Sequence, residues 1–153
     1  MKEIQLSKGR IAIVDDEDHA AVVSSKWYVW NGYAIRHLGL INGVKKSQKM
    51  HRMIMGEPSG LEIDHINGNK LDNRRSNLRA CTRQQNKLNR GPYANNKSGM
   101  KGVSWHAQTS KWRATIRFNN KITHLGLFNS KDAAHHAYSE AASRLHGDFA
   151  KTS

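Results

Sequence analysis

Apolar positions fall into two groups along the chain, separated by a polar stretch at Arg90–Gly99. In the first group they predict a strand at Arg10–Val14, a helix at Glu17–Ser25 and an antiparallel meander over residues 26–50. Asn-Gly pairs divide the meander, because these residues tolerate the positive φ angles of tight hairpin turns. Its predicted strands and turns are Lys26–Trp30, Asn31-Gly32, Tyr33–Leu38, Asn42-Gly43 and Val44–Met50. Four aromatic residues that could stack on bases are expected in its core instead: Trp27, Tyr28, Trp30 and Tyr33.

A second pattern follows the meander. Glu62–Ile66 predicts a short strand, and Lys70–Ser76 continues as a polar loop. Asn77 is a favourable N-cap for a helix from Leu78 to about Asn89. Its inner side would be formed by Leu78, Cys81, Gln85 and Leu88, and a second, basic side by Arg79, Arg83, Asn86 and Arg90.

The polar stretch at Arg90–Gly99 combines Gly, Pro and Asn and predicts a linker. After it, strands are predicted at Val103–Gln108, Trp112–Asn119 and Ile122–Phe128, followed by a helix at Lys131–His146. Ser130 is expected to cap this helix and Gly147 to end it. The stripe that would lie on the sheet consists of Ala134, Ala137, Tyr138, Ala141 and Leu145.

Alternation along the strand at 112–119 separates two faces of this sheet. The residues expected to pack against the helix are Trp112, Ala114, Ile116 and Phe118, joined by Val103 and Trp105. The residues of the opposite face are Arg113, Thr115 and Arg117, joined by Ser104 and His106. That face is either an ordinary solvated surface or a ribbon that enters the DNA major groove, and the charge of the chain favours DNA.

The net charge of the 153 residues is +13, with a pI near 10.2. Residues 1–25 hold three basic and five acidic side chains, so the positive charge lies in the rest of the chain. Double-stranded DNA is therefore the expected partner. A membrane is not expected, because no apolar run is long enough to span one and no hydrophobic signal segment opens the chain. Cys81 is the only cysteine, which excludes a disulfide framework and fits a cytoplasm, bacterial or phage-infected.

One stretch carries candidate chemistry: DHINGNKLDNRRSNLRACTRQQN, residues 64–86. Phosphodiester hydrolysis needs a base for water and a cation for the leaving oxygen. A neutral His65 suits the base, and Asp64 and Asn86 supply hard oxygens of the kind that hold Mg²⁺. Asn77 could brace the loop between them.

The residue types alone leave other interpretations of this stretch open. DHINGN is by itself a reasonable hairpin turn without chemistry. A calcium loop fails, because Ile66 occupies a ligand position and Asn69 the position that requires glycine. A zinc site also fails, because the sequence does not offer the cysteines or a convincing histidine pair that zinc binding requires.

The same stretch resembles the core of HNH homing endonucleases, whose module is a β-hairpin, a metal ion and an α-helix. Asp64-His65, Asn77 twelve residues after the histidine and Asn86 nine residues later match the variant that ends in asparagine. The resemblance implies His65 as general base, Asp64 and Asn86 as ligands of Mg²⁺ or Mn²⁺, and Asn77 as a structural brace. The preceding 60 residues also resemble this family. Expected DNA contacts in this part are Arg52, Arg79 and Arg83, although packing is an equal alternative for Arg52.

Residues 101–147 resemble the Apetala-two, or ethylene-response-factor, DNA-binding domain of plants. The shared pieces include Lys101-Gly102-Val103, Lys111-Trp112 and Leu125-Gly126. The DNA contacts that this resemblance implies are Lys101, Ser104, His106, Arg113, Thr115, Arg117 and His124. Ser104, His106, Thr115 and His124 depart from the plant pattern, so the plant target sequence does not carry over.

Together these patterns predict an α+β protein: a ββα-metal nuclease domain with an N-terminal β-meander at 1–90, a linker at 91–97, and at 98–153 a three-stranded antiparallel sheet on one helix. The predicted function is a metal-dependent DNA endonuclease of the homing or phage type, acting as a monomer. Two alternatives are a sequence-specific DNA-binding regulator with an inactive nuclease-derived domain and, more weakly supported, a non-specific RNA-binding protein. The complete set of Asp64, His65, Asn77 and Asn86 favours the enzyme.

Overall fold

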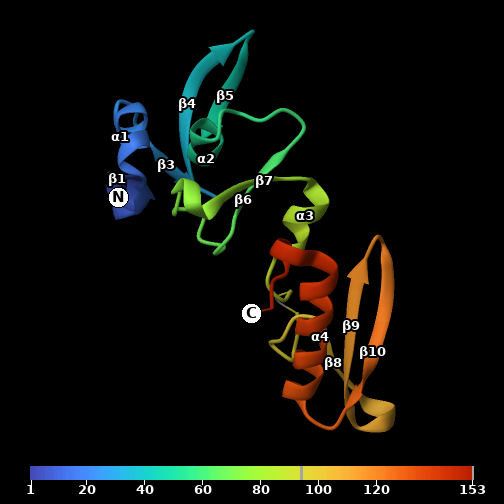
Figure 1. The fold of residues 1–153 in the computed structure, drawn as a ribbon. Helices are drawn as coiled ribbons and strands as arrows, with labels where there is room; N and C mark the ends of the chain where they lie inside the picture. Colours follow the sequence, from blue (N-terminus) through green and yellow to red (C-terminus); the bar gives the residue numbers. More distant parts are fainter. Residues whose placement is uncertain (94, 153) are drawn as a thin grey trace. The chain divides into compact units, whose positions relative to one another are not determined.

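The computed structural model describes residues 1–93 and 95–152, which form two compact units, Met1–Asn86 and Lys87–Ser153 (Figure 1). The structure mixes helices with several small antiparallel sheets, as predicted. None of the helices in these described ranges is long and apolar enough to cross a membrane.

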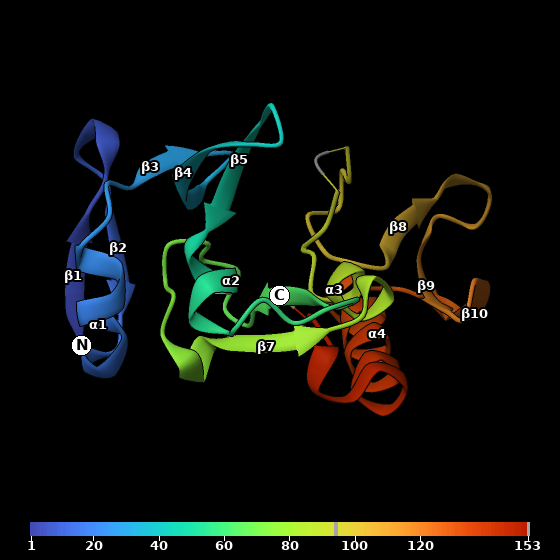
Figure 2. The ribbon, with the colours of Figure 1, turned by 90° about the horizontal axis from the view of Figure 1, so that it is seen from above.

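The first unit begins with a hairpin of β1 (Lys2–Gln5) and β2 (Ile11–Val14), beside which lies α1 (Asp16–Val23) (Figure 2). The predicted meander follows as β3 (Tyr28–Trp30), β4 (Tyr33–Ile41) and β5 (Val44–Lys49). Both Asn-Gly turns have positive φ at each residue, which confirms the turn prediction. The strand β1 and the short helix α2 (Met50–Ile54) were not predicted from the sequence.

The unit ends with a two-stranded sheet of β6 (Glu62–His65) and β7 (Leu78–Cys81), followed by α3, which spans Arg83–Leu88. The prediction of a helix from Leu78 was therefore wrong, because backbone pairing with β6 holds Leu78–Cys81 extended. The helix begins after Thr82, whose Oγ1 accepts from the amide of Gln85 at 3.2 Å while the Gln85 Oε1 accepts from the amide of Thr82 at 2.8 Å. This reciprocal capping box, visible in the sequence as Thr-x-x-Gln, is the signal that the helix prediction missed. Asn77 lies in a short 3₁₀ turn instead of capping a helix.

One apolar core joins the elements of this unit. It contains Ile4, Val14, Val22, Trp27, Ala34, Met50, Ile63, Leu71 and Leu78. Trp27 is buried as predicted, but Trp30 is 59% exposed, so placing all four meander aromatics in the core was wrong. Trp30 lies at the turn end of β3, where no element covers it.

The second unit consists of β8 (Val103–His106), β9 (Lys111–Phe118) and β10 (Lys121–Phe128) in one antiparallel sheet, with α4 (Lys131–His146) packed on one face (Figure 1). The Ser130 Oγ accepts from the Ala133 amide at 3.1 Å, and Gly147 has a φ of 53°, which confirms both helix ends. Gly102 is required at the helix–sheet contact, because a Cβ there would lie 2.1 Å from the Tyr138 ring.

Ala114, Ile116, Tyr138 and Ala141 are buried between this sheet and its helix. Trp105 and Phe118 are 52% and 39% exposed, so the prediction that they join the core was wrong. The Trp105 ring instead packs edge-on against Trp112, its partner on β9, at the margin of the sheet.

Candidate active site

The β6–β7 hairpin positions Asp64 and His65. In its register Asp64 lies opposite Arg79 and His65 opposite Leu78. Glu62 and Asp64 are two residues apart on β6 and therefore share a face. Both Asp64 and His65 are buried, and burial of two such polar side chains requires defined partners.

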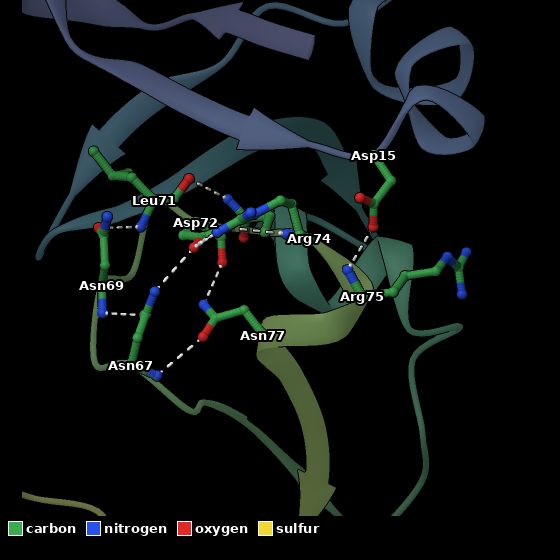
Figure 3. Close-up of polar contacts among 9 residues, drawn as sticks. Asp15, Asn67, Asn69, Leu71, Asp72, Arg74, Arg75 and Asn77 are labelled. Atoms are coloured by element: carbon green, nitrogen blue, oxygen red, sulfur yellow. Dashed lines mark hydrogen bonds and ion pairs between the residues drawn. The ribbon is translucent and has the colours of Figure 1, made fainter. Parts of the chain in front are cut away.

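The asparagine-rich loop between β6 and β7 is built from side chain–backbone bonds (Figure 3). The Asn77 Oδ1 accepts from the amide of Asn67 at 2.9 Å, and its Nδ2 donates to the carbonyl of Asp72 at 2.8 Å. The Asn67 Nδ2 donates to Asp72 Oδ2 at 2.9 Å, and the Asn69 Oδ1 accepts from the amide of Leu71 at 3.1 Å. The asparagine side chains thus satisfy polar groups of the loop in addition to its backbone–backbone bonds.

Two arginines fix the far side of the loop (Figure 3). Arg74 makes a two-pronged ion pair with Asp72 at 2.7 and 2.8 Å, and this pair lowers the pKa of the Asp72 carboxyl. The Arg75 amide donates to Asp15 at 2.8 Å, and its guanidinium binds Asp18 at 2.7 and 2.9 Å. The acidic N-terminal segment therefore anchors a basic loop.

The second anchor of the loop is β2. The Ile13 amide donates to the Leu71 carbonyl at 2.8 Å, and the Asn73 amide donates to the Ile13 carbonyl at 2.7 Å. These bonds place Asn73, which is fully buried, beside the predicted base.

His65 is 4% exposed, and its Nε2 lies 3.4 Å from the Asn73 Oδ1. The Asn73 Nδ2 donates to the Leu71 carbonyl at 3.1 Å, so its amide oxygen must face the histidine. Because an amide oxygen only accepts, this bond assigns the proton to Nε2 and the lone pair to Nδ1. Burial lowers the pKa of His65, against opposing effects of Asn73 and Asp64, so the ring is neutral near pH 7.

Aromatic rings and ammonium groups adjoin this histidine. The His51 ring packs edge-on against His65 at 4.8 Å, and the Tyr33 ring lies 5.2 Å from His51 and 6.0 Å from His65. The ammonium groups of Lys49 and Lys70 each lie 4.5 Å from the centre of the Tyr33 ring. Burial, with a contribution from His65, lowers the pKa of His51 to about 3, so it too is neutral.

The predicted metal ligands lie among other polar groups. The Asp64 Oδ2 accepts from Arg79 Nη2 at 2.8 Å and from Nε at 3.0 Å. Asn86, on α3, donates from its Nδ2 to Glu62 Oε2 at 2.6 Å. Because a carboxylate only accepts, this bond fixes the Asn86 amide and turns its oxygen away from Glu62. Sequence reasoning did not identify Glu62 or Asn73, although both neighbour predicted site residues in space.

The donor chemistry around Asp64 fits a hard divalent cation. Carboxylate and amide oxygens from Asp64, Glu62 and Asn86 are of the type that Mg²⁺ prefers. Over the described ranges, His, Cys, Asp and Glu side chains form no group of three that could hold a metal ion. A magnesium site here would therefore depend on few protein oxygens, with water and phosphate completing the shell, and Arg79 would share Asp64 with the metal.

Comparisons with known proteins show the family of this chain. A family model described as HNH endonuclease matches residues 44–88, the segment from β5 to α3. The chain is 33% identical over 152 residues to "Uncharacterized HNH endonuclease L560" of Acanthamoeba polyphaga mimivirus, covering 94% of this chain and 74% of that protein. The chain belongs to the HNH endonuclease family. It is also 35% identical over 94 residues to "Protein 3.8" of Escherichia phage T7, covering 61% of this chain and 77% of that protein. No solved structure matches significantly.

This HNH endonuclease is thus a nuclease with DNA as its substrate, in a family that generally uses divalent metals. Of its predicted DNA contacts, Arg52 binds Glu57 at 2.7 Å and the carbonyls of Leu61 and Pro58 at 3.0 and 3.1 Å. These bonds direct the Arg52 guanidinium into a loop of its own unit. Arg79 pairs with Asp64 as described, whereas Arg83 is exposed on α3.

In the second unit, Lys101 is half-buried and donates to the Leu88 carbonyl, and burial lowers its pKa to about 8. The other predicted contacts lie on one face of the sheet. Arg113 binds the Ser104 Oγ from its two nitrogens at 3.3 and 3.4 Å, and Thr115 pairs in register with His124. His106 binds Thr109 at 2.9 Å at the end of β8, and Arg117 is exposed. The structure therefore gathers six of these seven residues on one surface, with Lys101 directed elsewhere.

Two exposed apolar residues that were not predicted as contacts also lie on this face. Ile122 pairs across the strands with Arg117, and Leu127 pairs with Arg113. Each guanidinium thus has an apolar neighbour in register.

Proposed function

We propose that this protein is a metal-dependent DNA endonuclease of the homing or phage type in which His65 is the general base. The observation that carries the proposal is the neutral, buried imidazole held through Nε2 by Asn73, one residue from Asp64. A base must be neutral and oriented before substrate arrives, and both conditions are met.

In the proposed reaction, the Nδ1 of His65 takes a proton from water as the water oxygen forms a bond to phosphorus. The ester P–O bond breaks, and the leaving oxygen takes up a proton from solvent. Asp64 and Asn86 would hold Mg²⁺ or Mn²⁺, which would supply charge stabilisation for the leaving oxygen. Glu62 orients Asn86 through the 2.6 Å bond, so that the amide oxygen is available as a ligand.

Asn77 acts in this proposal as a brace. Its two bonds, to the Asn67 amide and the Asp72 carbonyl, join both ends of the loop. The same loop carries Asn73, so loss of the brace would displace the partner of His65. The order strand, strand, helix of β6, β7 and α3 supports a ββα-metal arrangement.

The second part of the proposal divides the tasks along the chain: residues 1–90 cut, 91–97 link, and 98–153 bind DNA in the manner of an Apetala-two domain. A three-stranded sheet with one helix on its back and arginines on its front supports this assignment. The contacts would come from Ser104, His106, Arg113, Thr115, Arg117 and His124, and the protein would act as a monomer.

The direct test incubates the purified protein with supercoiled plasmid, with and without Mg²⁺ or Mn²⁺. Conversion to nicked or linear DNA only with metal supports the proposal. Conversion without added metal, in the presence of a chelator, contradicts the metal requirement. DNA binding without conversion on a library containing the genomic region around its own gene would favour a DNA-binding regulator instead.

A further inference from the structure

Four arginines around the hairpin of the first unit have acidic partners. Arg52 binds Glu57, Arg74 binds Asp72, Arg75 binds Asp18 and Arg79 binds Asp64. Their charges are therefore compensated within the protein and contribute little to attraction of an anion.

Lys49 and Lys70 differ from these arginines. Within the described residues, neither ammonium forms an ion pair with a carboxylate, and both lie 4.5 Å from the Tyr33 ring centre. Lys49 ends β5 and Lys70 follows β6 by five residues, so two separate segments bring positive charge to one ring. Lys70 also donates to the Asn31 carbonyl at 3.1 Å.

The ring holds the two lysines in advance of substrate. Its negative face attracts an ammonium, which offsets part of the entropy lost when a long side chain is fixed. Two like charges beside one ring repel each other, and an anion between or beside them would relieve this repulsion.

The position of the ring relates this charge to the reaction. Tyr33 lies 5.2 Å from His51 and 6.0 Å from His65, centre to centre. Both histidine rings are buried beside it.

We infer that Lys49 and Lys70, held by Tyr33, bind the non-bridging oxygens of the phosphate beside His65 and stabilise the negative charge that grows there during hydrolysis. This inference rests on the proposed role of His65. A phosphodiester carries one negative charge, and attack by hydroxide adds a second, so a fixed pair of cations stabilises the transition state more than the bound substrate.

The test replaces each lysine by methionine, singly and together, because methionine keeps most of the stem and removes the charge. Loss of one charge-assisted contact should lower kcat/KM about 10- to 100-fold, and the double variant should lose more. Lys70→Arg and Lys49→Arg keep the charge and should restore most of the activity. Lys26→Met is the matched control, since Lys26 lies 5.9 Å over Tyr28, a ring that neighbours His37 and not His65.

Salt dependence separates phosphate binding from a structural role. In a His65→Ala background, which leaves the DNA uncut, the double variant should lower the slope of log K against log salt by roughly 1, because both lysines contact one phosphate. An unchanged slope together with reduced activity would assign the lysines a structural role and overturn the inference. Unchanged kcat/KM in the double variant would overturn it as well.

The two hypotheses fail in different ways. If His65→Ala cuts at the wild-type rate, the proposed base is wrong whatever the lysines do. If His65→Ala is inactive but the lysine variants are fully active, only the inference about Lys49 and Lys70 fails. Thermal unfolding of Lys70→Met identifies any effect of losing the bond to Asn31.

Discussion

The active-site loop and the β8–β10 sheet face both present polar side chains, but they hold them in opposite ways. Asn73 and Asn77 of the loop, and His65 at the end of β6 beside it, are buried and bonded to one another or to backbone. On the sheet, Arg113, Arg117 and His124 are exposed. The first arrangement fixes atoms, and the second keeps charge accessible.

This difference follows from what each task requires. A general base must lie within hydrogen-bond reach of its proton, and a small misplacement costs a large factor in rate. Burial of polar groups costs free energy unless every bond is made, which is why the loop needs so many asparagines. Attraction of DNA needs only charge on a surface that the duplex can approach. The comparison predicts that substitutions in the loop will affect rate and stability, whereas substitutions on the sheet will affect affinity alone.

The largest expected effect is that of His65→Ala on the rate of cleavage. Cleavage should fall by roughly 10²- to 10⁴-fold because water loses its base, while DNA binding should change little. Single-turnover cleavage and equilibrium binding measure the two quantities separately. His37→Ala is the control, because His37 is an exposed histidine of β4 that contacts Tyr28. Cleavage by His65→Ala at the wild-type rate would remove this histidine from the mechanism.

Asn77→Ala should affect stability as well as rate. It removes the acceptor for the Asn67 amide and the donor for the buried Asp72 carbonyl, at about 1 to 3 kcal/mol for each group left unsatisfied. Urea unfolding gives the stability, and plasmid cleavage the rate. Asn77→Asp keeps an oxygen that can accept from the Asn67 amide, so it should retain more of that hydrogen bond than Asn77→Ala does. A variant of normal stability and low activity would show that Asn77 acts on substrate and not as a brace.

The sequence predicted α4 correctly because its ends carry local signals, Ser130 and Gly147, which require nothing from the rest of the chain. The prediction of a helix from Leu78 failed because the spacing of the apolar residues Leu78 and Cys81 fits a helix. The segment is a strand because it pairs with β6, which lies more than ten residues away in the sequence. The local signal at Thr82 and Gln85 marks the true helix start.

The candidate site shows the same division. Asp64, His65, Asn77 and Asn86 could be proposed from the sequence, because their spacing is a property of one segment. Asn73, Glu62 and the lysines at Tyr33 were missed, since their importance depends on contacts that only the folded chain creates. The pairing of Arg75 with Asp18 is an extreme case, because the two residues are 57 positions apart.

Arg113→Ala and Arg117→Ala test whether the sheet face contributes to DNA affinity. Each should weaken DNA binding by roughly 1 to 3 kcal/mol if its guanidinium contacts a base edge, with the unfolding free energy unchanged. Arg144→Ala is the control, as an exposed arginine of α4, which covers the other face of the sheet. Binding is measured with the same DNA at one fixed salt concentration. If the double variant binds as tightly as the wild type, the sheet face is not the docking surface.

The smallest effect concerns His146, a residue of the second unit that resembles the active-site loop in being buried, polar and bonded to backbone. Its Nε2 lies 3.2 Å from the Arg117 carbonyl and must donate to it, which leaves Nδ1 unprotonated and, within the described residues, without a hydrogen-bond partner. Protonation of Nδ1 would place a charge in this buried position. Burial lowers the pKa of His146. The positive charge of Lys101 lowers it further, whereas the hydrogen bond to the Arg117 carbonyl raises it.

Because the folded-state pKa lies below the ordinary value of 6.5, the unfolded chain binds the proton more readily, and the contribution of His146 to stability falls as pH drops below about 6.5. One proton changes the unfolding free energy by at most about 1.4 kcal/mol per pH unit. His146→Gln keeps a donor for the Arg117 carbonyl but does not titrate, so urea unfolding between pH 7.5 and 5 should show a smaller loss of stability than in the wild type. The histidines of the first unit are the same in both proteins, so they cancel in the difference. Identical pH dependence in the two proteins would mean that the buried position of His146 tolerates the proton, which would contradict the prediction.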